Sequence, residues 1–196
     1  MNTRGTRKKA KEPVSPDRLP GDPSKTELVD RVIRVDQAGE YGAVRIYEGQ
    51  LAVLGRKNGG HPVIEHMLEQ ERAHLETFDG LVAERRVRPT ALMPFWHVAG
   101  FALGAATAML GEKAAMACTV AVEETIDEHY AEQIEALEPY GDEDALKDTC
   151  VQFREDELAH RDTGLEHGAE QTPGYEVLTG AIKAGSRLAI WLSTRV

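Results

Sequence analysis

The sequence contains one pattern twice: a single glutamate stands about one helical hairpin ahead of a Glu-x-x-His pair. The residues are Glu40, Glu71 and His74 in the first copy, and Glu123, Glu157 and His160 in the second. Residues three positions apart lie on one face of an α-helix, so each pair can reach the same ion. Four glutamates and two histidines, divided equally between two halves, are the ligand set of a di-iron or di-manganese site inside a four-helix bundle.

The two copies also agree in their spacing. Tyr47 follows Glu40 by seven positions, and Tyr130 follows Glu123 by seven. The lone glutamate precedes its Glu-x-x-His pair by 31 positions in the first copy and by 34 in the second. One such pair is expected by chance in a chain with 33 acidic residues and seven histidines. The double match instead indicates a duplicated helical hairpin.

The surroundings of these residues favour a redox metal. Small and apolar residues flank Glu40 and Glu123, and ionised carboxylates are costly to bury without counter-ions. Two divalent cations would neutralise four carboxylates. Carboxylate and imidazole ligands suit iron or manganese, and a ligand set without thiolates argues against structural zinc. Glu124 should face away from the site, toward solvent or a neighbouring helix.

The remaining signals predict an all-α chain. Expected helices span residues 24–54, 62–88, 112–137 and 142–170, with a last helix after Pro173. Ser24 and Glu27 form a capping box at the first start, and Pro62 suits the first turn of the second helix. We therefore expect one ferritin-like four-helix bundle domain over residues 24–196, made from the duplicated hairpin plus a crossover helix and a C-terminal amphipathic helix.

Charge and composition exclude some functions. The net charge is −10, although residues 1–25 carry seven Lys/Arg and only three Asp/Glu. An acidic body argues against nucleic acid as a partner. Residues 1–23 are basic and proline-rich, so we expect a disordered tail rather than a presequence helix or a secretory signal. Cys118 and Cys150 have no metal-type spacing and are expected to be buried free thiols in a reducing compartment.

An uncharged segment, residues 91–110, separates the two hairpins. Its length approaches that of a membrane span, but proline and glycine interrupt it, so a buried crossover helix and a helix in the bilayer interface are the alternatives. The interfacial alternative would place Phe95, Trp96, Phe101 and Leu103 in the lipid. The last helix is amphipathic, with cationic residues and Trp191, which suits either a membrane surface or packing against the bundle.

Several blocks of the sequence resemble one enzyme family. They are DRVIRVDQAGEYGAVRIYEGQLAVLG, RVRPTALMPFWHVAGFALGA, EKAAMACTVAVEETIDEHY and AGSRLAIWLS. The chain is similar through these blocks, from about residue 26 to its end, to the demethoxyubiquinone hydroxylases of ubiquinone biosynthesis. All six ligand positions of that family's motif are matched by the six residues above.

The resemblance implies a membrane-bound di-iron monooxygenase that uses O2 to hydroxylate the ring of a polyprenylated demethoxyubiquinone or demethoxyubiquinol. It implies two irons, with a reductant that can be NADH, and a lipid-binding partner protein in eukaryotic members. The location would be the cytoplasmic face of a bacterial cell membrane, or the matrix side of the mitochondrial inner membrane. The short tail favours the bacterial case. Tail length of the quinone and oligomeric state, including a homo-oligomer, stay open.

Individual roles follow from combining the pattern with this resemblance. Glu71 and Glu157 can bridge two irons, and each remaining ligand would hold one of them. Tyr130 and His129 could pass protons or electrons, although Tyr130 is equally suited to a structural role. Trp96 lies on the substrate route or anchors the chain in lipid.

Two other functions compete with this hypothesis. One is another membrane-associated di-iron oxidase, such as a quinol oxidase or an iron oxidase, which would reduce O2 to water without adding an oxygen atom to the ring. The other is a non-catalytic helical scaffold that binds lipid. Metal analysis and the fate of the oxygen atom would distinguish them.

Overall fold

Six α-helices and two short 3-10 turns make up the part of the chain that the computed structural model describes, residues 21–58 and 61–196. The helices are α1 (Lys25–Asn58), α2 (Pro62–Arg85), α3 (Met93–Met109), α4 (Glu112–Leu137), α5 (Asp144–Glu166) and α6 (Tyr175–Ser193). The all-α prediction is confirmed. The predicted tail over residues 1–23 lies almost wholly outside the described residues.

Local signals account for where α1, α2 and α4 begin. Ser24 and Glu27 form the predicted capping box, in which the Ser24 backbone N–H donates to Glu27 Oε2 (2.8 Å) and the Glu27 N–H donates to Ser24 Oγ (3.2 Å). These two hydrogen bonds satisfy donors that a helix start otherwise leaves free. Pro62 stands in the first turn of α2, and Glu112 begins α4 directly after Gly111, as predicted.

Three predicted boundaries are wrong. The first helix continues past Gly55 to Asn58, because one glycine costs only about 1 kcal/mol in a helix and Leu54 is anchored in the core. The second ends at Arg85 rather than residue 88, since Arg86 turns to the left-handed conformation (φ 56°). The predicted helix over 142–170 is split by Gly168 (φ 82°) into α5 and a 3-10 turn, Ala169–Gln171.

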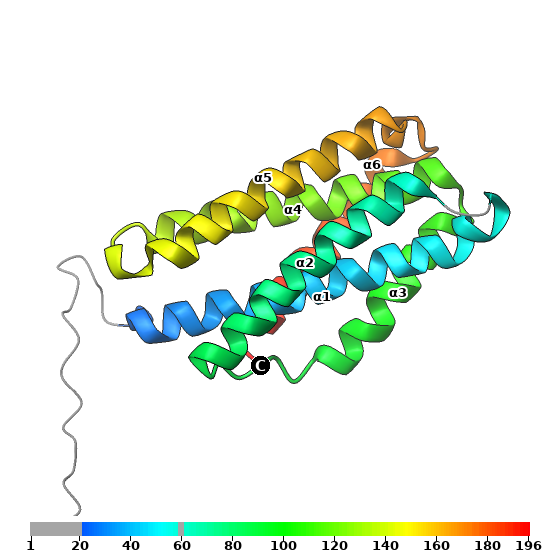
Figure 1. Cartoon of the computed structure of the whole chain (residues 1–196). Helices are drawn as coiled ribbons and strands as arrows, with labels where there is room; N and C mark the ends of the chain where they lie inside the picture. Colours follow the sequence, from blue (N-terminus) through cyan, green and yellow to red (C-terminus); the bar gives the residue numbers. More distant parts are fainter. Residues whose placement is uncertain (1–20, 59–60) are drawn as a thin grey trace, which may run out of the picture.

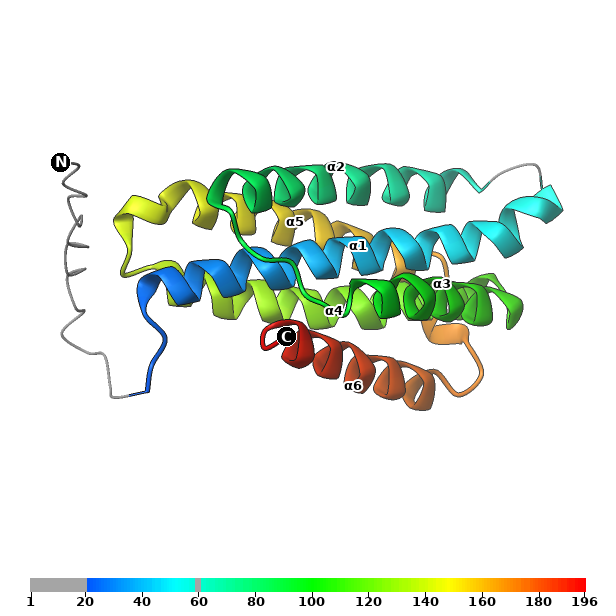
Figure 2. The ribbon, with the colours of Figure 1, turned by 90° about the horizontal axis from the view of Figure 1, so that it is seen from below.

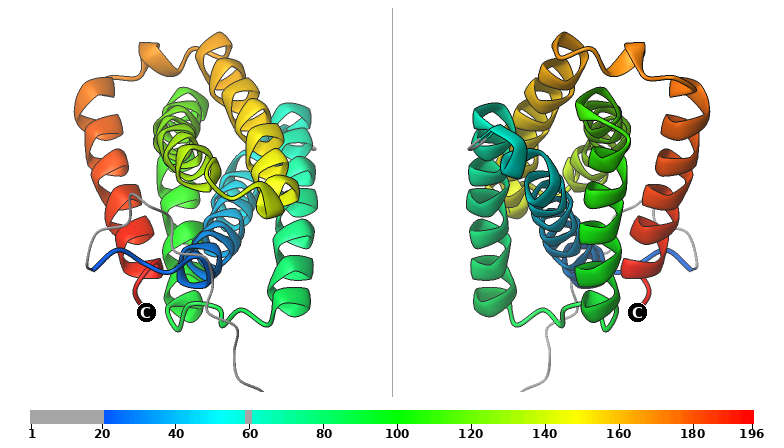
Figure 3. Two further views of the ribbon diagram at one scale, coloured as in Figure 1. Left: turned by 90° about the vertical axis from the view of Figure 1, so that its left-hand side faces the viewer. Right: turned by 90° about the vertical axis from the view of Figure 1, so that its right-hand side faces the viewer.

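Two helical hairpins, α1–α2 and α4–α5, form the four-helix bundle. Figure 1 shows the hairpins side by side, with α3 along α1. Seen from below in Figure 2, α2 and α5 lie on one side and α6 on the other, with α1 between them and α3 level with α4; α3 packs against α1 and α6 against α4. The end-on views of Figure 3 show the same order, so α3 and α6 together cover one face of the bundle. The predicted ferritin-like arrangement with a crossover helix is confirmed.

Glycines allow α3 to approach α1 closely. A Cβ at Gly104 would overlap the backbone carbonyl oxygen of Ile46, and a Cβ at Gly100 would lie 2.9 Å from the carbonyl oxygen of Gly42. Only glycine can occupy such positions without displacing the neighbouring backbone. The Gly100-x-x-x-Gly104 spacing therefore lets the backbones of α1 and α3 pack closely.

Along the described ranges, no helix is both long and apolar enough to cross a bilayer.

The apolar core is divided into two main clusters, one toward each end of the bundle. The first includes Val44, Tyr47, Ile64, Met67 and Val120, and the second includes Ile33, Phe78, Tyr130, Leu146 and Phe153. On each of α1, α2, α4 and α5, the predicted ligand residues fall between the segments that contribute to these two clusters. The fold thus places the polar layer in the middle of the bundle, closed by apolar packing at both ends.

Candidate metal centre

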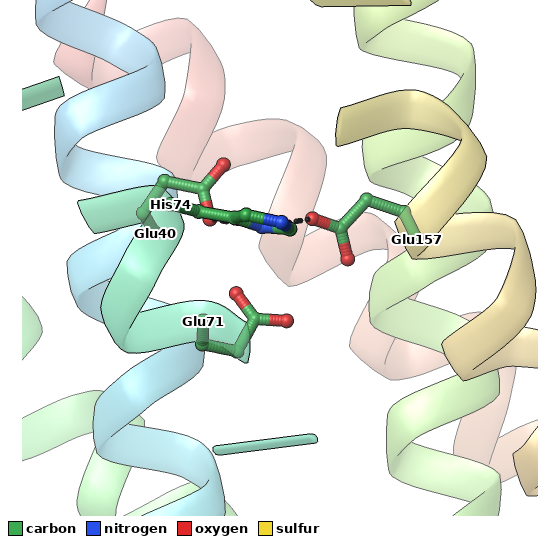
Figure 4. Close-up of side chains that lie close together, drawn as sticks. All are labelled: Glu40, Glu71, His74 and Glu157. Carbon is green, nitrogen blue, oxygen red and sulfur yellow. Dashed lines mark ion pairs between the residues drawn. The ribbon is translucent and has the colours of Figure 1, made fainter. Parts of the chain in front are cut away.

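All six residues of the duplicated pattern point into the centre of the bundle. Glu40 comes from α1, Glu71 and His74 from α2, Glu123 from α4, and Glu157 and His160 from α5. Each is at most 3% exposed. Figure 4 shows four of them converging from three helices. The structure therefore brings together every residue that the sequence proposed as a metal ligand.

The six residues form two overlapping groups of four. One group is Glu40, Glu71, His74 and Glu157, and the other is Glu71, Glu123, Glu157 and His160; ligand atoms within each group lie within 4.8 Å of one another. Glu71 and Glu157 belong to both groups, while each histidine belongs to one. This is the division expected when two carboxylates bridge a pair of ions and each ion has one imidazole.

Both histidines direct the same ring nitrogen into the site. His74 Nδ1 lies 3.3 Å from Glu157 Oε1 and 3.5 Å from Glu40 Oε2. His160 Nδ1 lies 3.0 Å from Glu71 Oε1 and 3.3 Å from Glu157 Oε2. The Nε2 atoms point outward. Each imidazole can therefore present one nitrogen to an ion and keep its proton on the other.

Burial and mutual repulsion perturb the carboxyl groups. Burial, followed by repulsion from neighbouring carboxylates, raises the pKa of Glu71 and Glu123 well above its ordinary value. Burial also raises the pKa of Glu40. Burial opposes ionisation of Glu157 too, but the close imidazoles of His160 and His74 outweigh it and lower the pKa of Glu157 to about 2. Without cations, the layer must hold extra protons.

The hydrogen bonding of the layer leaves room for cations. Several of its buried atoms make no hydrogen bond within the described part of the chain: both Glu71 oxygens, Glu123 Oε2, Glu157 Oε1 and His74 Nδ1. Buried polar atoms are normally paired, so such a gathering needs a ligand. Oxygen and imidazole nitrogen donors in this number suit two divalent transition-metal ions. The buried glutamate and histidine cluster is compatible with a metal site.

A second ring of side chains holds the six residues in place. Tyr130 Oη donates to Glu40 Oε1 (2.5 Å), and Tyr47 Oη donates to Glu123 Oε1 (2.8 Å). The sequence predicted Tyr130 near the site but gave Tyr47 no partner. The ring of His74 also stacks on Phe153, with ring centres 3.9 Å apart.

Two further residues of this ring were missed by the sequence reasoning. His74 Nε2 donates to Asp156 Oδ2 and His160 Nε2 donates to Gln70 Oε1, both at 3.2 Å. Each partner directly precedes the glutamate of a Glu-x-x-His pair. This shared position could have been noticed in the sequence. That the two residues bond the histidines of the opposite hairpin, however, depends on how α2 packs against α5. Glu124, as expected, faces away and pairs with Lys183 of α6.

His129 has a different environment from its neighbour Tyr130. Its Nε2 lies 3.6 Å from Asp36 Oδ1 and accepts from Gln133 Nε2 (2.9 Å). Gln133 also donates to Asp36 Oδ1 (2.7 Å). Asp36 stands one helical turn before Glu40, so this polar group lies beside the layer of six candidate ligand residues, which we call the metal layer. None of the contacts of His129 reaches one of those six residues. A role for His129 stays a prediction.

An apolar cavity of about 710 Å³ adjoins the metal layer, between α1, α3, α4 and α6. On α1 its lining includes Gly39 and Ala43, which flank Glu40, and on α4 it includes Val122, which precedes Glu123. Three of the four residues that the sequence placed at the substrate or membrane line it, namely Phe95, Trp96 and Leu103. The fourth, Phe101, instead lies under the Arg45 guanidinium, 5.0 Å from the ring centre.

Comparison with known proteins identifies the family. The model of the family described as "Ubiquinone biosynthesis protein COQ7" matches residues 27–193, which include all six residues of the metal layer. The chain belongs to the COQ7 family. The resemblance seen in the sequence blocks is thereby confirmed.

Curated relatives of this COQ7 family member are found in bacteria and in mitochondria. The chain is 64% identical over 181 residues to the 3-demethoxyubiquinol 3-hydroxylase of Rhodospirillum rubrum, covering 92% of this chain and 84% of the relative. It is 57% identical over 171 residues to the human mitochondrial NADPH-dependent 3-demethoxyubiquinone 3-hydroxylase, covering 86% and 78%. It is 43% identical over 183 residues to the mitochondrial 5-demethoxyubiquinone hydroxylase of Saccharomyces cerevisiae, covering 86% and 78%. The COQ7 relatives are thus named as hydroxylating enzymes, which agrees with the predicted enzyme class.

Proposed function

We propose that this chain hydroxylates the quinone ring of a polyprenylated demethoxyubiquinol or demethoxyubiquinone, in ubiquinone biosynthesis, with O2 as co-substrate. The observation that carries the proposal is the pair of overlapping ligand groups that share Glu71 and Glu157, in a chain of the COQ7 family. Its relatives are named as hydroxylases of demethoxyubiquinol or demethoxyubiquinone. Two metal positions, an apolar cavity beside them and the family relationship all support the same reaction.

Two iron ions fit the ligand set best. Glu40 and His74 would hold one ion, Glu123 and His160 the other, and Glu71 and Glu157 would bridge them. Iron is favoured over zinc because reduction of dioxygen requires a redox-active metal. When bound, the two ferrous ions supply electrons for that reduction. The protein's own contribution is to neutralise and orient them with four buried carboxylates and two imidazoles.

Tyr130 is the residue for which we propose a proton-handling role. Its hydroxyl donates to Glu40 Oε1, and burial raises its pKa well above the ordinary value, so it stays protonated at neutral pH. We propose that Tyr130 holds Glu40 in place and exchanges a proton with it, and that His129, which contacts Asp36 and Gln133, assists proton transfer beside the site. A purely structural role of Tyr130 is the alternative, and a comparison with Tyr47 distinguishes the two.

The apolar cavity is the proposed substrate site. Its volume of about 710 Å³ suits a quinone head with the first part of its isoprenoid tail, and its lining is almost wholly apolar. Trp96 lines the cavity and donates from Nε1 to Ser193 Oγ (3.0 Å), which joins α3 to the end of α6. The cavity thus runs from the helices that carry Glu40 and Glu123 to the face that α3 and α6 cover.

The same face is the proposed membrane contact. Large apolar side chains are exposed on it, at 60% for Phe95, 65% for Val98, 56% for Leu188 and 51% for Trp191. Apolar residues exposed together on amphipathic helices favour a bilayer interface. We propose that residues 24–196 act as one di-iron domain, with α3 and α6 on the membrane surface, so that a long-tailed quinone enters from the lipid. A lipid-binding partner protein and a homo-oligomer belong to the same proposal.

The location and the reductant are proposed from the relatives. A bacterial relative and mitochondrial relatives are both similar to this chain, and the cytoplasmic face of a bacterial membrane is the proposed location. Several relatives are named NADPH-dependent, so NADPH is the proposed donor. Parallel assays with NADPH and NADH separate this choice from the NADH expectation.

The central experiment follows metal and oxygen together. Purified protein loaded anaerobically with Fe²⁺ should hold close to two irons per chain, and with reductant and ¹⁸O₂ it should place one labelled oxygen on the demethoxy quinone ring, seen by mass spectrometry. Glu71→Ala and His160→Ala should lose both iron and product. Glu69→Ala and Glu155→Ala, which alter exposed acids on the same helices, should keep both. Hydroxylation by iron-free protein would refute the mechanism, and label only in water would indicate an oxidase.

Filling the cavity tests the substrate site. Ala99 lines the cavity, whereas Ala102, three residues later on α3, is exposed and does not. Ala99→Phe should raise the KM for a long-tailed quinone about tenfold, which corresponds to about 1.4 kcal/mol of binding, with iron content unchanged. Ala102→Phe is the matched control and should leave KM near the wild-type value. Equal effects of the two variants would place the substrate elsewhere.

A further inference from the structure

The two histidines of the metal layer differ in the group that receives their outer hydrogen bond. His74 Nε2 donates to Asp156 Oδ2, and His160 Nε2 donates to Gln70 Oε1, each over 3.2 Å. Asp156 and Gln70 occupy the same position in the two copies, directly before the ligand glutamate. The arrangement is symmetric in geometry, and it differs in charge, because one acceptor is a carboxylate and the other is a neutral amide.

The structure keeps both imidazoles in one orientation. In each ring Nδ1 faces the carboxylates of the layer, and Nε2 faces the residue on the opposite hairpin. The ring of His74 is fixed further by its stacking on Phe153 at 3.9 Å, and that of His160 by an edge-on contact with Tyr47 at 6.2 Å. Differences between the two nitrogen ligands therefore arise from the acceptor at Nε2 rather than from ring position.

A carboxylate acceptor makes an imidazole a stronger metal ligand. The hydrogen bond from Nε2–H to a negative oxygen raises the electron density and basicity of the ring, and loss of such a partner costs about 10–100-fold in metal affinity. An amide oxygen orients the ring without adding charge. The side chain of Asp156 is 34% exposed, whereas that of His74 is 4% exposed. Water therefore partly screens the charge of Asp156, while the His74 ring that donates to it is buried.

We propose that Asp156 and Gln70 make the two metal positions unequal: the position of His74 fills first and holds its ion more tightly, and that of His160 fills second. Asp156 and Gln70 are positioning residues in this proposal, since neither belongs to the ligand groups. The inference rests on the proposed di-iron function, because it presupposes that both positions take a metal. It assigns different metal affinities to the His74 and His160 positions, although their ligand residues follow the same pattern.

Titration of metal-free protein with Fe²⁺ under anaerobic conditions tests the order. Wild-type protein should bind in two steps whose dissociation constants differ about tenfold or more. Asp156→Asn keeps an acceptor and removes the charge, and it should weaken binding at the His74 position about 10–100-fold while changing binding at the His160 position less than about threefold, so that the order of filling is lost or reversed. Gln70→Glu should do the opposite and strengthen the second step. Glu155→Gln, at the exposed neighbouring position, controls for general charge and should change neither.

Mössbauer spectra identify which position fills. One equivalent of ⁵⁷Fe²⁺ should give one dominant quadrupole doublet in wild-type protein, and in Asp156→Asn either two doublets of similar area or dominance of the other doublet. Circular dichroism checks that each variant is folded. If one equivalent of iron gives the same dominant doublet in Asp156→Asn as in wild-type protein while two irons still bind, the inference is wrong and the proposed function stands. If wild-type protein binds fewer than two irons, both are wrong.

Discussion

Tyr130 donates a hydrogen bond of 2.5 Å to Glu40, although 90 positions separate them in the chain. In the other copy of the pattern, Tyr47 donates to Glu123 over 2.8 Å across 76 positions. Each tyrosine follows one ligand glutamate by seven residues and bonds the glutamate of the opposite hairpin. These two bonds tie α1 to α4 through the metal layer, one from each side.

Removal of the two tyrosine hydroxyls should separate structure from chemistry. Tyr47→Phe and Tyr130→Phe each remove one donor from a buried carboxylate, so each should lower the free energy of unfolding of the iron-loaded protein by about 1–3 kcal/mol. Thermal unfolding measures this effect. If Tyr130 also conducts a proton, hydroxylation should fall about tenfold or more in Tyr130→Phe only. Equal activities in the two variants would leave Tyr130 a structural role.

Replacement of Glu71, which we propose to bridge the two ions, should change stability in opposite directions with and without metal. Burial and repulsion raise the pKa of Glu71, so its contribution to stability is full below the unfolded pKa and is lost as pH rises through the folded pKa. Glu71→Gln should therefore stabilise the metal-free protein by about 1–3 kcal/mol at pH 7–8 and destabilise the iron-loaded protein. Unfolding with and without a chelator measures both, and equal signs would contradict the bridging role.

Metal affinity should increase with pH. Burial lowers the pKa of His74, but the close carboxylates of Glu157 and Glu40 outweigh this and raise it to about 11. The pKa of Glu71 and of Glu123 is raised as well. The metal-free layer therefore holds protons at neutral pH that an ion must displace. Between pH 6 and 8, the apparent affinity should rise about tenfold per pH unit for each proton released. Proton release in weakly buffered solution gives the count, and affinity independent of pH would contradict this account.

Close contact between α1 and α3 should make Gly104 sensitive to any side chain. Gly104→Ala would place a methyl group against the Ile46 carbonyl, which should lower stability by about 1–3 kcal/mol and narrow the adjoining cavity. Gly80→Ala is the matched control, because nothing lies within 4 Å of a Cβ there. The control should be neutral or should stabilise α2 by up to about 1 kcal/mol. Similar unfolding temperatures for both variants would show that the helices can separate without cost.

Features set by neighbouring residues were predicted well. The capping box at Ser24 and Glu27, the extent of α4 from Glu112 to Leu137, and the two Glu-x-x-His pairs follow from spacings of a few residues on a helix. Glu40 and Glu123 were identified instead by the repetition of the pattern in the two halves. Boundaries at Gly55, Arg86 and Gly168 were less accurate. At these positions the conformational preference of one residue differs by only about 1 kcal/mol between helix and turn, so core packing decides where the helix ends. The local sequence pattern carries no information about that packing.

The amino-acid sequence by itself determined the chemistry of the centre, because a helix puts residues three apart on one face and so fixes which side chains can act together. Only the tertiary structure decided which faces meet. It pairs Tyr47 with Glu123, gives His74 the charged partner Asp156 and His160 the neutral partner Gln70, and opens an apolar cavity beside the layer. These relationships depend on how α2 packs against α5 and how α3 and α6 cover α1 and α4. Such contacts join residues far apart in the chain, and no local spacing encodes them.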